Sequence, residues 1–149
     1  MRFADIEDIF YFGYGHNTDV EEFVRRVPGA KPLGVGVLKN FKFILKHYAD
    51  IENQEDTECR GVVWKITNRD LKILDHDEGL HKNYNRIPVE IELGSKKIRA
   101  TTYIMDPAYH SSSLPSKKYI KMLAIGYKEN GIPMSQLVDA LEERLEETK

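Results

Sequence analysis

The chain has 149 residues, of which 41% are hydrophobic and 31% charged, and its 22 basic and 24 acidic side chains give a net charge of −2. This length fits one compact domain with a sizeable core, so residues 1–149 are predicted to form a single domain. The balanced charge, with no basic stripe along the chain, argues against nucleic acid or an anionic membrane as a partner.

The first part of the chain is predicted to contain a strand, a tight loop and a helix. Ile9–Tyr14 is rich in aromatic side chains and glycine, which is typical of a buried strand. Thr18 and Glu21 have the spacing of a capping box, and apolar residues recur at helical intervals over Val20–Val27. The unit therefore runs from strand to helix through a short glycine-containing loop.

The next part is predicted to form strands separated by polar segments. Leu33–Leu38 and Phe41–Tyr48 are expected to be two strands joined by Lys39-Asn40. Asp50–Glu58 is polar and acidic and is expected to be a solvated loop, and Gly61–Ile66 follows it as another strand.

A short helix and a hairpin come next. Thr67 is predicted to cap the helix, with Asp70 three residues further on. Apolar and polar residues then alternate over Ile87–Leu93, which indicates a strand, and Gly94-Ser95 is a two-residue turn signal. Ile98–Met105 should therefore pair with it in an antiparallel hairpin.

The last third is predicted to be a loop followed by two helices. Pro107–Pro115 is expected to be the loop, and Ser116 to cap a helix that ends at about Glu129. Ser135–Glu147 is predicted to be an amphipathic helix, and the residues expected on its apolar face are Leu137, Val138, Leu141 and Leu145. Together the elements predict an α+β fold with a mixed, curved, barrel-like sheet of about six or seven strands and three or four helices.

The first candidate site is the glycine loop Tyr14-Gly15-His16-Asn17, between the first strand and helix. Gly13 and Gly15 permit close approach of the backbone, and a helix start offers free N–H groups. Such a loop suits a carboxylate, a carbonyl oxygen or a developing oxyanion. Short glycine turns without any ligand are also common, so this loop alone leaves both interpretations open.

The second candidate site is an acidic turn that brings together Asp75, Asp77 and Glu78, just before Gly79. Like charges this close disfavour one another's ionisation, so at least one carboxyl is expected to have a raised pKa. A carboxylate of that kind is a candidate general base near neutral pH. The alternative is a charged helix end in water.

Histidine and cysteine give little support for a metal site. His76 and His81 are not at the spacing of a helical zinc pair, and Gly79 interrupts the helix between them. Cys59 is the single cysteine, so no internal disulfide can form, and a small buried residue is a better interpretation than a nucleophile. A metal site is therefore not expected.

The apolar stretches bear on location. Residues 1–8 lack the apolar region of a signal peptide, and no stretch reaches the ~18 apolar residues of a membrane span. A cytoplasmic protein without a membrane partner is therefore expected.

Three segments, in order along residues 9–133, resemble motifs of the γ-glutamyl cyclotransferases. They are Tyr11–Asn17 (family “YFAYGSN”), Gly61–Ile66 with Leu74–Gly79 and Tyr84 (family “GVVW … LDxxEG … Y”), and Pro115–Tyr119 with Lys128–Pro133 (family “PSxxY … KENGLP”). The chain departs from the family at His16, where serine is usual, at Gly13, where alanine is usual, and at Thr18, where leucine is usual. His16 can replace the serine if the loop binds through its backbone.

The resemblance implies a barrel-like fold and a reaction on a small γ-glutamyl compound that needs neither a metal nor any other cofactor. The substrate's α-amine attacks its own side-chain carbonyl and releases 5-oxoproline with an amino acid or amine. Glu78 is implied to be the catalytic acid/base. The implied substrate-binding residues are Tyr14, Gly15, His16, Asn17 and Tyr84. The alternative is a non-catalytic module that binds a small ligand in the same pocket. The sequence is compatible with either a monomer or a homodimer.

Overall fold

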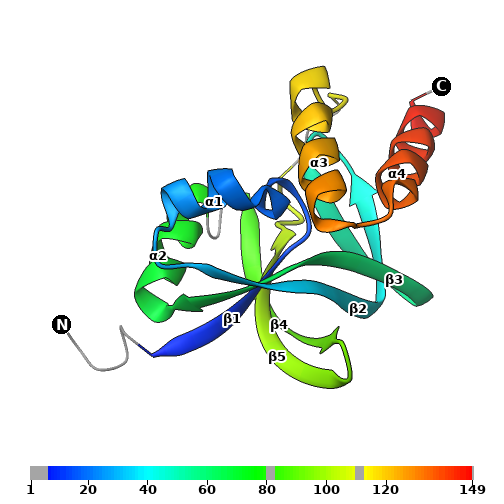
Figure 1. Cartoon of the computed structure of the whole chain (residues 1–149). Helices are drawn as coiled ribbons and strands as arrows, with labels where there is room; N and C mark the ends of the chain where they lie inside the picture. Colours follow the sequence, from blue (N-terminus) through cyan, green and yellow to red (C-terminus); the bar gives the residue numbers. More distant parts are fainter. Residues whose placement is uncertain (1–6, 80–82, 110–112, 149) are drawn as a thin grey trace.

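The computed structural model describes residues 7–79, 83–109 and 113–148, and in these residues five strands close into a barrel (Figure 1). The strands are β1 (Asp8–Gly13), β2 (Lys31–Leu45), β3 (Ala49–Thr67), β4 (Tyr84–Leu93) and β5 (Lys96–Met105). Their order around the barrel is β1-β3-β2-β4-β5. All neighbours are antiparallel except β5 and β1, which pair in parallel at Tyr11 and Thr101. The predicted mixed, barrel-like α+β fold is confirmed, with fewer strands than expected.

Helices pack on the outside of the barrel in two groups. They are the short 3-10 helix η2 (His16–Thr18), α1 (Val20–Arg26), α2 (Asn68–Asp77), α3 (Lys117–Asn130) and α4 (Met134–Glu147). Figure 1 shows α1 beside α2 on one side of the barrel and α3 beside α4 on the other. Among the described residues, no helix is long and apolar enough to cross a membrane.

The strand count differs because two predicted strands are one. The chain runs straight through the predicted break at Lys39-Asn40, where Asn40 has a positive φ of 63° and the register with β3 shifts. The Asn40 side-chain oxygen accepts a hydrogen bond from the Asp56 N–H at 3.1 Å, which closes this irregularity. Asparagine tolerates positive φ, so the strand continues as a bulge.

The predicted acidic loop Asp50–Glu58 is wrong, because this segment belongs to β3. Ile51 pairs with Phe43, and Asn53 pairs with Phe41. The polar side chains of residues 52–56 are exposed on a two-stranded ribbon, in which Glu52 pairs with Lys42 and Asn53 with Phe41. Composition predicted the exposure of residues 52–56 correctly, although Asp50 and Ile51 are buried, and exposure does not distinguish a loop from an exposed hairpin.

Helix α1 begins one residue later than the capping pattern predicts. Asp19 is its N-cap, since the Asp19 carboxylate accepts a hydrogen bond from the Glu22 N–H at 3.2 Å. Thr18 is fully buried in η2, and its hydroxyl donates to the Gly15 carbonyl at 2.8 Å. The predicted capping box at Thr18 and Glu21 is therefore wrong, and Thr18 holds the glycine loop instead.

Other local signals are confirmed. Thr67 and Asp70 form a reciprocal capping box at the start of α2, and Ser116 caps α3. Gly94, with φ of 61°, forms the turn between β4 and β5. These signals are local, so they do not depend on which elements pack together.

The apolar face of α4 is only partly as predicted. Leu137 is buried together with Ala140, whereas Val138 is 44% exposed and Leu145 is 43% exposed. The helix therefore buries a narrower stripe than the pattern of large apolar residues indicates, and this stripe includes a small alanine.

Buried aromatic rings fix α1 against the barrel, beneath the glycine loop. The ring of Phe23 lies 4.3 Å from that of Trp64 and 5.8 Å from that of Tyr11, measured between centroids. All three side chains are almost completely buried. This packing holds the middle of α1 at a fixed place relative to β1 and β3.

Candidate active site

The glycine loop follows β1 and turns at once into η2. The Thr18 N–H donates to the Gly15 carbonyl at 3.1 Å, and the Asp19 N–H donates to the His16 carbonyl at 3.2 Å. Within the described part of the chain, the N–H groups of Gly15, His16 and Asn17 make no hydrogen bond. They are free to donate to a bound carbonyl or carboxylate oxygen.

Gly15 lets this loop lie close to its neighbours. A Cβ at this position would lie 3.2 Å from the Ala49 Cβ in β3 and 3.5 Å from the Tyr119 hydroxyl in α3. The Ala49 N–H in turn donates to the Tyr119 hydroxyl at 3.0 Å. A glycine here therefore brings the loop, β3 and α3 together around one small space.

Glu78 is the C-cap of α2, and its N–H donates to the Leu74 carbonyl at 2.8 Å. Burial raises the pKa of the Glu78 carboxyl to about 7, against the opposing effect of the Arg26 charge, and the neighbouring Asp77 raises it further. A raised pKa was predicted from crowding of like charges, whereas loss of solvent is its main cause.

The three carboxylates of the acidic turn have separate partners. Asp75 accepts a hydrogen bond from the Tyr103 hydroxyl at 2.6 Å and lies 3.2 Å from the Arg86 guanidinium. Asp77 lies 2.9 Å from Arg26. Glu78 has no ion pair within the described residues. Two carboxylates are thus neutralised by cations, and the third faces the loop.

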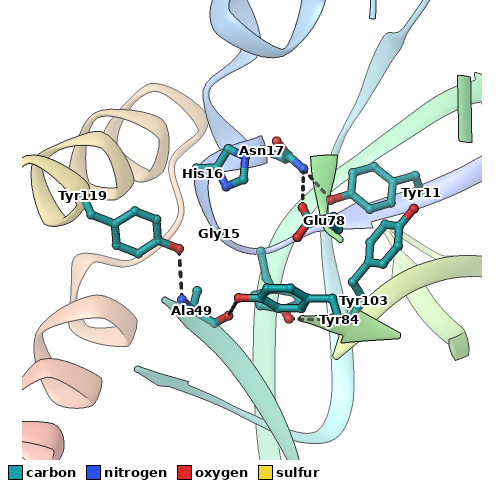
Figure 2. Close-up of a pocket in the computed structure, with 10 residues that line it drawn as sticks. Tyr11, Gly15, His16, Asn17, Ala49, Glu78, Tyr84, Tyr103 and Tyr119 are labelled. Carbon is teal, nitrogen blue, oxygen red and sulfur yellow. Dashed lines mark hydrogen bonds between the residues drawn. The ribbon is translucent and has the colours of Figure 1, made fainter. Parts of the chain in front are cut away.

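Glu78 and the glycine loop meet through Asn17. The Asn17 side-chain amide donates to the Glu78 carboxylate at 3.4 Å and to the Tyr11 hydroxyl at 2.8 Å (Figure 2). The Trp64 indole N–H donates to the Asn17 carbonyl at 3.0 Å. Asn17 is therefore held by two buried residues, Tyr11 of β1 and Trp64 of β3.

The space between these groups consists of an inner and an outer cavity. The inner cavity has a volume of about 30 Å³, and its lining residues are Tyr11, Tyr14, Gly15, His16, Asn17, Ala49, Glu78, Tyr84, Tyr103 and Tyr119. The outer cavity has a volume of about 350 Å³, and its lining residues are His16, Tyr48, Asp77, Glu78, Asn83, Tyr84, Tyr119 and Met122. Glu78 lines both cavities and so stands where they join.

The cavity walls include tyrosine hydroxyls that bind main chain. The Tyr14 hydroxyl donates to the Tyr103 carbonyl at 2.5 Å, and the Tyr84 hydroxyl donates to the Ala49 carbonyl at 2.7 Å. Burial raises the pKa of both phenols, so both stay protonated. These two residues shape the pocket and fix its walls, with their own hydroxyl protons already engaged.

His16 lines both cavities with a neutral imidazole. Burial lowers the pKa of the ring, and the Arg26 charge lowers it further, while Glu22 and Asp77 oppose them. No hydrogen bond of the ring involves another described residue. His16, one of the three departures from the family pattern, is therefore a polar, uncharged group that both cavities share.

All six site residues inferred from the sequence line one pocket. Those are Tyr14, Gly15, His16, Asn17, Glu78 and Tyr84. The sequence interpretation missed Tyr11, Ala49, Tyr103 and Tyr119 among its lining residues. Tyr11 and Tyr119 lie within the segments that resemble family motifs, and this position could have identified them. Nothing in the local sequence distinguishes Ala49 or Tyr103.

Histidine and cysteine form no alternative site in the described residues. No group of three or more His, Cys, Asp or Glu side chains there could hold a metal ion. His81, of the histidine pair considered above, lies outside the described residues, as do residues 110–112 of the predicted loop. Cys59 is completely buried, and burial raises the pKa of its thiol, so its predicted role as a small interior residue agrees with its surroundings.

Comparison with known proteins places a chain with this fold and pocket in a recognised class. Residues 58–140 match the AIG2-like family. A γ-glutamylcyclotransferase of Bos taurus is 32% identical over an alignment that covers 90% of this chain and 78% of the relative. The corresponding protein of Homo sapiens is 31% identical, with 87% and 76% covered. A solved γ-glutamyl cyclotransferase structure superposes with a TM-score of 0.79 at 30% identity, covering 90% of this chain and 86% of that one. The chain belongs to the γ-glutamylcyclotransferase family.

Proposed function

We propose that this protein is a γ-glutamyl cyclotransferase that converts a small γ-glutamyl compound into 5-oxoproline and a free amino acid or amine. The observation that carries this proposal is Glu78, a carboxyl in a small pocket whose pKa is raised to about 7. A group with this pKa both accepts and returns a proton near neutral pH. The family membership of the chain supports the same reaction.

In the proposed reaction, the α-amine of the γ-glutamyl group attacks the side-chain carbonyl carbon. The amine proton passes to the Glu78 carboxylate, and the new C–N bond closes the lactam ring. As the intermediate collapses, Glu78 returns the proton to the leaving nitrogen and the original C–N bond breaks. No proton is gained or lost overall, so one carboxyl suffices for both transfers.

The glycine loop is proposed to stabilise the negative charge that develops on the carbonyl oxygen. Gly15, His16 and Asn17 have N–H groups without an internal partner among the described residues. Removal of one such donor from an enzyme typically costs about 3 kcal/mol of transition-state stabilisation. Because ring closure is intramolecular, holding the substrate in a reactive pose supplies much of the remaining acceleration.

The two cavities are proposed to separate the two halves of the substrate. The inner one, between the loop and Glu78, would hold the γ-glutamyl group against Tyr14 and Tyr84, opening further as the substrate enters. The outer one, which is larger and includes Tyr48 and Met122, would hold the leaving amine or amino acid. Glu78 at their junction lies where the proton must pass.

Further properties are proposed together with this activity. Proton transfer and oxyanion stabilisation are both assigned to protein groups, so the reaction requires no metal or other cofactor. The chain is proposed to act in the cytoplasm as a single catalytic domain, as a monomer or homodimer, without a nucleic-acid or membrane partner.

The test is to incubate the protein with γ-glutamyl dipeptides, γ-glutamylamines and glutathione, and to detect 5-oxoproline by mass spectrometry. Turnover of at least one compound is expected, with loss of nearly all turnover in Glu78→Gln. The matched control is Glu129→Gln, which makes the same change at an exposed position of α3. Turnover that survives in Glu78→Gln would exclude the acid/base role, and saturable binding without turnover would favour a binding module.

A further inference from the structure

We propose that Arg26 is a positioning residue for Glu78, because it fixes the orientation of the Asn17 amide that contacts the Glu78 carboxylate. Arg26 does not line the pocket itself, so its effect on the base would be exerted through its neighbours. Where it concerns turnover, this inference rests on the proposed function.

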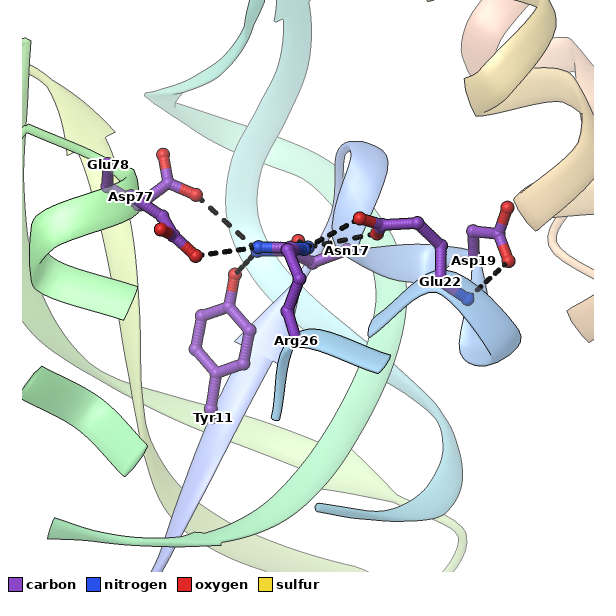
Figure 3. A network of polar contacts seen from close by, with 7 residues as sticks. All are labelled: Tyr11, Asn17, Asp19, Glu22, Arg26, Asp77 and Glu78. Atoms are coloured by element: carbon purple, nitrogen blue, oxygen red, sulfur yellow. Dashed lines mark hydrogen bonds and ion pairs between the residues drawn. The ribbon is translucent and has the colours of Figure 1, made fainter. Parts of the chain in front are cut away.

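The Arg26 guanidinium joins three separate elements. It binds both carboxylate oxygens of Glu22 within α1, at 2.7 and 3.0 Å, and it donates to Asp77 at the end of α2 at 2.9 Å. A third contact is a hydrogen bond to the side-chain oxygen of Asn17 in η2 (Figure 3). The planar guanidinium presents several donors in a fixed geometry, so one side chain sets the relative positions of all three groups.

The contact with Arg26 determines which end of the Asn17 amide faces the base. With its oxygen bound to Arg26, the amide nitrogen is directed toward Tyr11 and Glu78. If the amide turned over, its oxygen would face the Glu78 carboxylate and its NH2 group would face the guanidinium, and both contacts are repulsive. Arg26 therefore keeps a hydrogen-bond donor directed at Glu78.

Arg26 also sets the charge around Glu78. The titratable and charged groups that surround this carboxyl are Tyr11 of β1, Tyr14 and His16 of the glycine loop, Arg26 of α1, Asp77 of α2, Tyr84 of β4, Tyr103 of β5 and Tyr119 of α3, together with Asp50 of β3, which interacts with Tyr84. The tyrosines are neutral because burial raises the pKa of each, and His16 is neutral because burial lowers its pKa. Near neutral pH the charged groups that act on the Glu78 carboxyl are thus Arg26 and Asp77.

Removal of Arg26 acts on Glu78 in three ways, all of the same sign. The attraction of the guanidinium for the carboxylate is lost, the charge of Asp77 is no longer neutralised, and the Asn17 donor is free to turn away. Each change favours the protonated form of Glu78.

The neighbouring arginine supplies a matched control. Arg25 is also paired with the glutamate four residues before it, Glu21, at 2.8 Å. Its side chain is 72% exposed, against 25% for Arg26. Arg25→Gln therefore makes the same chemical change, on the same helix, without contact with the acidic turn.

The experiment compares Arg26→Gln, Arg26→Lys and Arg25→Gln by two measurements. The first is carbon-13 NMR titration of the Glu78 carboxyl, assigned by its disappearance in Glu78→Gln, which requires no turnover. The second is the pH profile of kcat and KM on the best substrate of the panel. Thermal unfolding confirms that each variant is folded.

Arg26→Gln is expected to raise the pKa of Glu78, to move the acidic limb of kcat/KM to higher pH, and to lower kcat by up to about a hundredfold with a smaller change in KM. Arg26→Lys keeps the positive charge but loses the planar set of donors of the guanidinium. The pKa of Glu78 should therefore stay near that of the wild type while kcat falls. Arg25→Gln should match the wild type in both measurements.

An unchanged pKa in Arg26→Gln, or an equal shift in Arg25→Gln, would overturn the inference. If the wild type turns over no compound of the panel, the proposed function fails, and the NMR titration still decides the role of Arg26. If Arg26→Gln does not fold, Glu22→Gln takes its place with Glu21→Gln as its control. Release of Arg26 from α1 should then move the Glu78 titration only in the Glu22 variant.

Discussion

The side-chain amide of Asn17 donates to the carboxylate of Glu78 across 3.4 Å, although the two residues are 61 positions apart in the sequence. One belongs to the loop after the first strand and the other ends a helix on the opposite side of the pocket. This contact joins the two halves of the candidate site.

The pH dependence of the reaction should follow the titration of Glu78. Its pKa is raised to about 7, so kcat/KM should rise with pH through this value as the base loses its proton. The measurement is a pH–rate profile between pH 5 and 9 on the best substrate. A kcat/KM that no longer rises with pH above pH 5 would show that the base is a solvated carboxyl, whose ordinary pKa is 4.5.

Glu78→Gln should stabilise the protein above neutral pH. The folded-state pKa of about 7 lies above the ordinary value of 4.5. Below pH of about 4.5 the group is protonated whether the chain is folded or not, so it has no cost; the cost appears as the pH rises and is complete above the folded-state pKa. The gain in unfolding free energy should be small at pH 5 and about 2 kcal/mol at pH 8, discounted because the residue is partly exposed.

Urea unfolding of the wild type and of Glu78→Gln at both pH values measures this difference. Glu129→Gln, at an exposed position of α3, should show no such change with pH. An equal effect of Glu78→Gln at pH 5 and pH 8 would contradict the raised pKa.

Gly15→Ala should impair catalysis while lowering the free energy of unfolding only slightly. The new Cβ would lie 3.2 Å from the Ala49 Cβ, so the loop must move by a few tenths of an ångström from β3. The expected cost in unfolding free energy is about 1 kcal/mol, together with a rise in KM as the N–H groups shift. Gly29→Ala is the control, since its Cβ would meet only an Asp70 oxygen at 3.9 Å. Equal kinetics in the two variants would mean that the loop position is not critical.

His16→Ser, which restores the residue usual in the family, should keep the reaction. If the loop acts through its N–H groups, kcat should change by only a few fold. The acidic limb of the pH profile should stay in place, because burial lowers the pKa of His16 and leaves the titration near neutral pH to Glu78. The relative rates across the substrate panel should change, since His16 lines the outer cavity. Loss of the acidic limb would instead assign that titration to His16.

Local signals in the sequence identified much of the fold. The capping box of Thr67 and Asp70, the turn at Gly94 and the cap at Ser116 each depend on groups within a few residues, and each is present. The β2–β3 ribbon was not predicted, because its pairing joins segments whose composition alone indicates solvent exposure. Thr18 was misassigned because its buried position depends on Gly126 of α3, where a Cβ would lie 2.2 Å from the Thr18 hydroxyl.

The sequence by itself determined the order of the motifs, and the six residues that it suggested for the site all line the pocket. It placed Glu78 among three carboxylates but gave no means of ranking them beyond a resemblance. Only the tertiary structure decided that Asp75 and Asp77 meet Arg86 and Arg26 while Glu78 faces the pocket. The physical reason is that a pKa depends on burial and on charges brought close by folding, and neither is a property of neighbours in the chain.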